Sequence, residues 1–374
     1  MDIMLLLVTI FSIIWMSISG LKIKSPLIFR WIIAFWVIGL ISLLFSMTVL
    51  PLPEVFKGSL YLMRFILYSL TFLIAYNLGK AKVLTAEGVI DVLILVGTIL
   101  AALGFLQLIF YPNFDYPFFA LTDFGYDPHH GRLAGVFLDP NFTGAHLSLT
   151  AGLVIYRLIG AKHKQKWLLL LIFLTLAIIL TYSRSAWLML ASFIFILVAF
   201  LWKNFSRAQK FILPAAVVVT FLGVALLNPR FTQRLIGGLT VDQTARERLL
   251  SWQSGLAITD VNPFLGIGFN NLSFVKENLN LYRSSAFGNE HSSAGLDSSL
   301  LVVLTTTGII GLIIYLIFWI QIFNGLLKVK NRIGVTLVAL IIALFLNSQF
   351  INSLFFPPIM LWYFLVLGTL WASY

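Results

Sequence analysis

The sequence predicts an all-α integral membrane protein, a single polytopic bundle of about eleven helices. Hydrophobic residues make up 60% of the 374 residues and charged residues only 10%, and the mean hydropathy is +0.98. A soluble domain carries nearer 25% charge, because its surface faces water. Charge-free stretches of the length that spans a bilayer recur along the chain, and basic residues concentrate in alternate loops. One membrane domain over residues 1–374 follows from these observations.

Each expected span is placed by its length and its lack of charge, since about 20 apolar residues in a helix cross the hydrocarbon core. The first span is interpreted as a membrane helix, because it lacks the basic start and the small-residue cleavage site of a signal peptide. The eleven spans lie near residues 3–20, 30–49, 59–79, 90–111, 136–156, 167–182, 185–202, 211–228, 298–324, 333–350 and 354–372.

The basic residues predict how the chain is oriented. One set of alternate loops holds 15 of the 25 Lys and Arg residues and only two acidic residues, Glu87 and Asp91. The other set holds ten basic and twelve acidic residues, so the two sides carry +13 and −2. The positive-inside rule assigns the basic loops to the cytoplasm, which places the N-terminus outside and the C-terminus inside. The net charge of +11 then reflects topology, and nucleic acid is not an expected partner.

This orientation puts three polar segments on the outer side: residues 112–135, the short turn 181–185 and the long loop 229–297. The long loop has six basic and six acidic residues and several aromatic ones, which is typical of a structure that lies on the membrane surface. Residues 244–258 predict a helix there, and the Pro and Gly residues of 262–268 end it.

Several arginines lie at the expected outer interface, where a charged side chain costs free energy and therefore indicates a structural or functional role. Arg184 lies between two closely abutted spans; it either snorkels to the interface or binds an anionic group. Arg246 and Arg248 precede Trp252. They either lie on a solvated amphipathic helix with their stems packed on the tryptophan, or provide a second cationic contact for the anion that Arg184 would bind. For Arg64, snorkelling or an ion pair with Glu54 competes with a functional role.

The segment 130–141 is dense in polar groups just before the fifth span. Pro140 disfavours helix at Asp139, so the segment is either a turn that presents side chains or an ordinary helix N-cap made by Asp139 and Asn141. The residues themselves leave both interpretations open.

Two candidate proton acceptors, His291 and Asp297, precede the ninth span. A lone exposed histidine is more often incidental than catalytic, but a proton acceptor is what activation of a hydroxyl requires. No metal and no cofactor are expected. The chain has no cysteine, its outer histidines are irregularly spaced, and no nucleotide-binding or serine-hydrolase motif lies in a suitable context.

Four motifs together resemble the bacterial O-antigen ligase and polymerase superfamily, integral membrane glycosyltransferases of the WaaL and Wzy type. They are RLAGVFLDPN over residues 132–141, TYSR over 181–184, RLLSW over 248–252 followed by NPFLGIG over 262–268, and GIIG over 308–311. Their order and the long outer loop among them also match.

The resemblance implies a GT-C-like bundle in the bacterial cytoplasmic (inner) membrane and a glycan donor on undecaprenyl pyrophosphate. It implies inverting transfer to a sugar hydroxyl on the outer face, without a metal, and membrane lipid, a flippase and a chain-length regulator as partners. By motif, Arg184 and Arg248 would hold the pyrophosphate, and Arg132 and Asn141 would line the same cavity. Arg246 is the further cationic candidate.

One position departs from the family pattern. Ligases of this family have a histidine as general base about eleven residues before the Gly-x-x-Gly element, and counting back from Gly308 reaches Asp297. His291 lies six residues further upstream. Either residue is a candidate base, and Asp297 is favoured as the positional equivalent.

The resemblance favours a polymerase that joins lipid-linked repeat units of a surface polysaccharide. A ligase that transfers a finished glycan to another acceptor uses the same chemistry and is the alternative. A transporter of lipid-linked sugars would require charges near the bilayer midplane and related halves, which the sequence lacks. A scaffold or sensor would not explain the outward arginines.

Overall fold

The computed structural model describes residues 2–113, 129–201, 243–279, 281, 295–328 and 331–373, with scattered positions between 215 and 233. Every regular element in these residues is a helix, and an isolated bridge pairs Asn113 with His130. The all-α class predicted from the sequence is confirmed.

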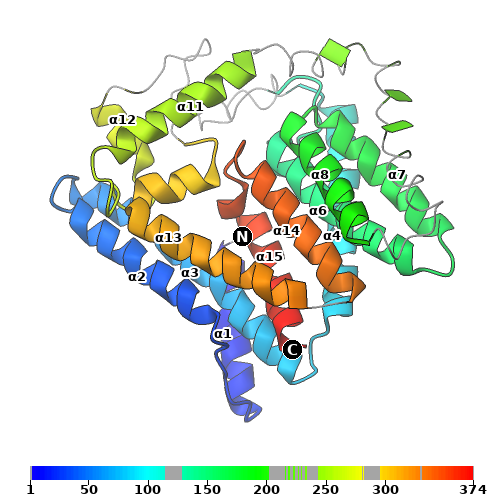
Figure 1. Ribbon diagram of the computed structural model, residues 1–374, viewed down its shortest axis with the longest axis horizontal. Coiled ribbons are helices and arrows are strands. Elements are labelled where there is room, and N and C mark those ends of the chain that lie inside the picture. The colour runs from blue at the N-terminus through cyan, green and yellow to red at the C-terminus, as the bar shows by residue number, and fades with distance from the viewer. Residues whose placement is uncertain are drawn as a thin grey trace.

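Ten apolar helices form the body of the described structure (Figure 1). Their bounds are α1 (Asp2–Ile18), α2 (Phe29–Ser46), α3 (Leu52–Lys80), α4 (Ala86–Phe110), α6 (Pro140–Gly160), α7 (Gln165–Leu180), α8 (Arg184–Leu201), α13 (Ser299–Lys328), α14 (Arg332–Asn347) and α15 (Pro357–Ala372). Six of them, α2, α3, α4, α6, α8 and α13, are long and apolar enough to cross a membrane, and the other four are shorter. The chain is a multi-pass membrane protein.

These ten helices correspond to ten of the eleven expected spans. The remaining one, expected at 211–228, lies almost entirely outside the described residues. The total of eleven therefore stays a prediction.

The helices pack as two groups with a pair between them. In Figure 1, α2, α3 and α13 lie on one side and α4, α6, α7 and α8 on the other, with α14 and α15 in the middle. α15 lies along α3, and α14 packs against both α8 and α6. The α14–α15 pair therefore touches both groups.

Polar contacts gather the basic loops at one end of the bundle. The Lys24 backbone N–H donates to Asn77 Oδ1 at 2.7 Å, which joins the start of α2 to the end of α3. Arg157 near the end of α6 forms ion pairs of 2.6 Å with Glu87 and 2.7 Å with Asp91 near the start of α4. The loops that the charge pattern groups together are thus neighbours in space.

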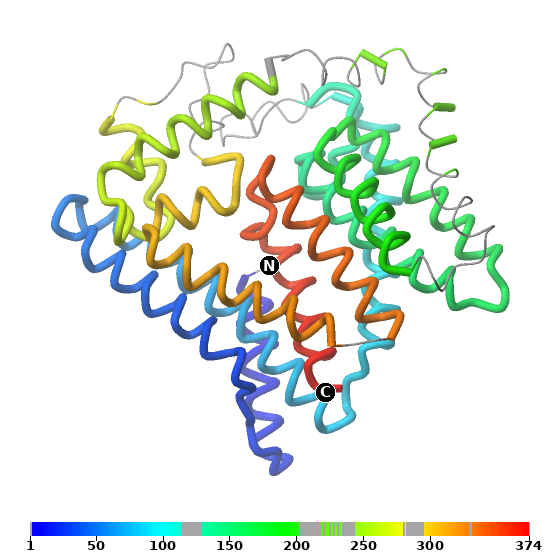
Figure 2. The backbone as a smooth tube through the Cα atoms, viewed as in Figure 1, coloured from blue at the N-terminus to red at the C-terminus, as the bar shows by residue number. Residues whose placement is uncertain are grey.

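Two further helices, α11 (Gln243–Thr259) and α12 (Leu272–Asn278), lie across the opposite end (Figure 2). α11 confirms the helix expected at 244–258. Two short 3-10 turns, η1 (Gly135–Phe137) and η3 (Ser353–Phe355), precede α6 and α15 at the same end. Helices α6 and α15 therefore begin at Pro140 and Pro357, later than the spans expected to begin at 136 and 354.

A backbone break divides α13 at Gly308, where φ is 67° and ψ is −174°. Only glycine adopts this region of backbone space at low cost. A Cβ at this position would overlap the carbonyl group of Phe264. The span expected near 298–324 is therefore present as α13, but its helix is broken at Gly308, where another chain segment packs against it.

The inserted segment is the loop 262–268 that follows α11. Ile309 donates its backbone N–H to Pro263 O at 2.8 Å, and Ile267 donates to Thr305 O at 3.0 Å. The loop thus takes over hydrogen bonds that an unbroken helix would make within itself. Two of the sequence motifs, 262–268 and 308–311, are parts of one joint.

An ion pair between Arg64 and Asp2 joins the N-terminal helix α1 to α3, whereas the sequence suggested a pair between Arg64 and Glu54. Arg64 Nη2 lies 2.7 Å from Asp2 Oδ2, and Tyr68 donates to Asp2 Oδ1 at 2.9 Å. The suggested pair of Arg64 with Glu54 is wrong, because α1 lies beside the middle of α3 and brings Asp2 within reach.

Gly308→Ala should destabilise the protein far more than Gly20→Ala. Both glycines have positive φ, but the space around Gly20 is open, whereas a Cβ at Gly308 meets backbone. We expect a cost of about 1 kcal/mol at Gly20 and about 3 kcal/mol at Gly308. The midpoint of thermal aggregation of the purified protein in detergent measures both. Equal losses would mean that the joint does not depend on the close approach.

Candidate functional site

The first motif and the second meet through a network of hydrogen bonds at the N-terminal end of α6 and the C-terminal end of α7. Arg132 Nε donates to Thr181 O at 2.9 Å, and its Nη2 lies 3.4 Å from Asn141 Oδ1. Ser183 Oγ donates to the same Asn141 oxygen at 3.0 Å. Because Arg184 follows Ser183 and begins α8, this network fixes the backbone from which its half-buried guanidinium extends.

Gln107 of α4 holds the loop that carries Arg132. Its Oε1 accepts from the backbone N–H groups of Ala134 at 2.9 Å and Gly135 at 3.1 Å, and its Nε2 donates to Arg132 O at 3.4 Å. The sequence analysis missed Gln107. Its amide inside an otherwise apolar expected span was the signal that could have found it.

Asp139 caps α6. Its Oδ1 accepts from the backbone N–H groups of Asn141 at 2.6 Å and Phe142 at 3.3 Å, which agrees with the N-cap interpretation of this segment. Burial raises the pKa of Asp139, and the two N–H donors and the Arg132 guanidinium oppose that rise. The carboxyl thus lies within the field of the same arginine that binds Asn141.

Asp297 lies on the other side of the site, held by α11. Its backbone N–H donates to Ser251 Oγ at 3.0 Å, and Trp252 Nε1 donates to Asp297 O at 3.3 Å. The Arg248 guanidinium, one turn earlier on α11, lies over the ring of Phe350 at 5.9 Å. The third motif therefore fixes both Arg248 and Asp297.

A buried lysine that the sequence analysis missed accompanies Asp297. Lys276 of α12 is 3% exposed and donates to Gly295 O at 2.5 Å. Burial lowers the pKa of Lys276 to about 8, against the opposing effect of Asp297. Burial raises the pKa of Asp297, while Arg248 and Lys276 act to lower it. Two cations thus oppose the rise in the pKa of Asp297 that burial causes.

The two sides of the site lie close enough to interact. The negative charge of Asp139, on the α6 side, is among the effects that raise the pKa of Asp297. Arg132 and Asn141 therefore share one region with Arg248 and Asp297, although Arg132 and Arg248 are 116 positions apart in the sequence.

 

The break between α14 and α15 lies between these two sides. Phe350 contacts Arg248, and Phe356 stacks on Phe142, next to Asn141, with ring centroids 4.2 Å apart. On the α13 side, Ser298 Oγ donates to Gln349 Oε1 at 3.3 Å. The break therefore contacts the residues that flank both arginine-bearing segments.

The same break carries buried polar atoms without a hydrogen-bond partner in the described part of the chain. They are both amide atoms of Asn347, Oδ1 of Asn352 and Oγ of Ser353. Buried polar groups are nearly always hydrogen-bonded, so such atoms mark a place suited to a water molecule or a ligand hydroxyl.

Two predicted site residues are not part of this arrangement: Arg246 is exposed on α11, and His291 lies outside the described residues. Among the residues that the structure describes, no group of three His, Asp or Glu side chains is arranged to hold a metal ion. The residues brought together are Arg132, Asp139, Asn141, Arg184, Arg248 and Asp297, with Gln107 and Lys276 in support.

Fold and site define a multi-pass membrane protein with arginines and a carboxyl gathered at one end of its bundle. Residues 168–316 match the family model described as O-antigen ligase. This segment includes the second, third and fourth motifs, so the resemblance to the O-antigen ligase and polymerase superfamily is confirmed over residues 168–316. No curated protein matches the chain.

Proposed function

We propose that the protein is a polysaccharide polymerase that transfers glycan from an undecaprenyl-pyrophosphate donor to the sugar hydroxyl of a second lipid-linked unit. The observation that carries this proposal is the gathering of Arg132, Arg248 and Asp297 in one region within a domain of this family. Guanidinium groups match phosphate oxygens with paired, charge-assisted hydrogen bonds.

In the proposed reaction, Arg184 and Arg248 bind the pyrophosphate, and Arg132 and Arg246 add positive charge nearby. The acceptor oxygen forms a bond to the anomeric carbon from the face opposite the pyrophosphate, so configuration inverts. The bond between that carbon and the pyrophosphate oxygen breaks, and its electron pair stays on the leaving group. The arginines stabilise the charge that develops there, and Asp297 accepts the proton of the hydroxyl.

The acceptor side is proposed to lie along the α14–α15 break. Asn352 and Ser353 offer hydrogen-bonding atoms without partners among the described residues, and Ser298 links the break to Asp297. A sugar presents several hydroxyl groups, which suit such a polar surface. The donor and the acceptor would then meet at Asp297 from different sides.

The proposed location is the bacterial cytoplasmic membrane, with the site on its outer face. The proposed partners are membrane lipid, a flippase that delivers the donor and a chain-length regulator. The charge difference between the two ends supports this orientation, because basic loops are retained in the cytoplasm.

A ligase that moves a finished glycan to another acceptor is the second candidate, and the description of the matching family model favours it. Ligase and polymerase share donor chemistry and differ in the acceptor. Transport of lipid-linked sugars is the candidate from another class.

A single cysteine should report the orientation, since the chain contains no native cysteine. Gln253→Cys on the exposed face of α11 should react with an impermeant thiol reagent in intact spheroplasts. Lys162→Cys in a basic loop should react only after the membrane is permeabilised. The reverse pattern would overturn the orientation.

Arg184→Ala and Arg248→Ala should each lower glycan transfer about 100-fold or more, because each removes a group that stabilises the leaving pyrophosphate. The measurement is the length profile of surface glycan in cells that lack the gene, complemented with each variant at equal membrane expression. Only the wild type should restore long chains in place of single repeat units.

Lys57→Ala is the matched control, since it removes one exposed positive charge near the outer end of α3. It should restore the wild-type profile. Long chains that accumulate on the carrier lipid in the deletion strain would favour the ligase, and an unchanged profile would contradict both glycosyl-transfer candidates.

Asp297→Asn should abolish transfer, and Lys276→Met should move the acidic limb of the pH profile to higher pH. Lys276 acts to lower the pKa of Asp297, so its removal lets burial raise that pKa further, and a higher pH is needed to ionise the base. Transfer assays in membranes across pH measure the limb. If Asp297→Asn is active and His291→Ala is not, His291 is the base.

A further inference from the structure

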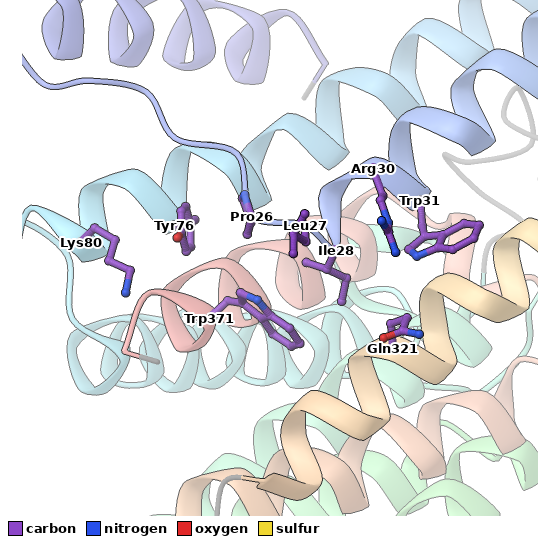
Figure 3. Close-up of a pocket in the computed structure, with 9 residues that line it drawn as sticks. All are labelled: Pro26, Leu27, Ile28, Arg30, Trp31, Tyr76, Lys80, Gln321 and Trp371. Atoms are coloured by element: carbon purple, nitrogen blue, oxygen red, sulfur yellow. The ribbon is translucent and has the colours of Figure 1, made fainter.

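A groove at the opposite end of the bundle, with a volume of about 460 Å³, has no role in the proposed reaction (Figure 3). It lies among the start of α2, the end of α3 and the C-terminal parts of α13 and α15. Its lining residues are Pro26, Leu27, Ile28, Arg30, Trp31, Tyr76, Lys80, Gln321 and Trp371.

Two cations flank this groove. Figure 3 shows Lys80 and Arg30 toward opposite ends, with Leu27, Ile28 and Trp371 between them. The Arg30 guanidinium lies 5.4 Å from the centroid of the adjacent Trp31 ring. Within the described residues, neither cation forms an ion pair with an acidic side chain. Each is therefore available for an anion.

The rest of the lining is apolar and aromatic. Leu27 is 80% exposed beside the cations, and Trp31 and Trp371 add indole rings. Tryptophan and tyrosine are enriched where the hydrocarbon core meets the headgroups, and basic side chains with apolar stems favour the same level. A free phosphate would use only the cations and would leave this apolar surface exposed to water.

We propose that this groove binds an anionic phospholipid. The positive charges of Arg30 and Lys80, toward the two ends of the groove, attract the phosphate, and the acyl chains lie against Leu27, Trp31 and Trp371. Basic pockets between membrane helices on the cytoplasmic side bind anionic headgroups in this way. The site is remote from Arg248 and Asp297, so the proposal does not depend on the proposed glycosyl transfer.

Such a lipid would join parts of the chain that are distant in sequence. The groove takes residues from four helices, and the lipid would contact all of them at the end where the basic loops meet. Bound lipid should therefore stabilise the folded protein in proportion to its occupancy.

The experiment uses the purified full chain in a neutral detergent, with dioleoylphosphatidylglycerol and dioleoylphosphatidylcholine as probes. Native mass spectrometry gives the affinities, and the midpoint of thermal aggregation gives the stabilisation. Phosphatidylglycerol should bind more tightly than phosphatidylcholine. The double variant R30Q/K80Q should weaken phosphatidylglycerol binding about 25-fold, since each basic residue contributes about fivefold.

The control variant K22Q/K82Q removes two exposed charges from the same loops but outside the groove, and it should keep the wild-type affinity. Equal losses of phosphatidylglycerol affinity in both double variants would mean that general surface charge attracts the lipid, and this result would overturn the proposal. Equal binding of the two lipids would do the same. Glycerol phosphate binding as tightly as the lipid would show a free-phosphate site instead.

Discussion

The joint between α13 and the loop 262–268 is the constraint on which the arrangement of the candidate site depends. A membrane helix normally satisfies its backbone groups within itself, because the bilayer core offers no water to do so. Here Gly308 opens the helix, and Pro263 and Ile267 supply the missing partners. The joint anchors the end of α11 to the bundle, and Arg248 and the contacts to Asp297 extend from α11. A substitution at the joint would therefore shift Arg248 and Asp297 through α11, without a direct contact to either residue.

The electrostatics of the site follow from this anchoring. Burial raises the pKa of Asp297 and lowers the pKa of Lys276. Each group opposes the shift of the other, and Arg248 also acts to lower the pKa of Asp297. In the proposed reaction, these two cations favour the ionised carboxylate that has to accept the proton.

The sequence predicted the helical class, the places of ten spans and α11, because these depend on runs of apolar residues and on local breakers. It did not predict the break at Gly308, since a glycine within an apolar run has no local sign of the loop that enters beside it. Gln107 and Lys276 were missed for a related reason: their roles come from distant backbone groups. Asp139 was recognised as a possible cap, because capping is local.

The two ends of the bundle differ in what their cations face. At the end that carries α11, Arg132 contacts the Asn141 amide and Arg248 lies near the Asp297 carboxyl, and these polar neighbours suit the recognition of one defined substrate. At the other end, Arg30 and Lys80 are accompanied by indole rings and aliphatic side chains. A diffuse, apolar-lined pair of cations suits a ligand that is abundant and held by its phosphate and chains together. Basic side chains at the two ends thus suit different ligands, because the side chains around them set the local dielectric and the available hydrogen bonds.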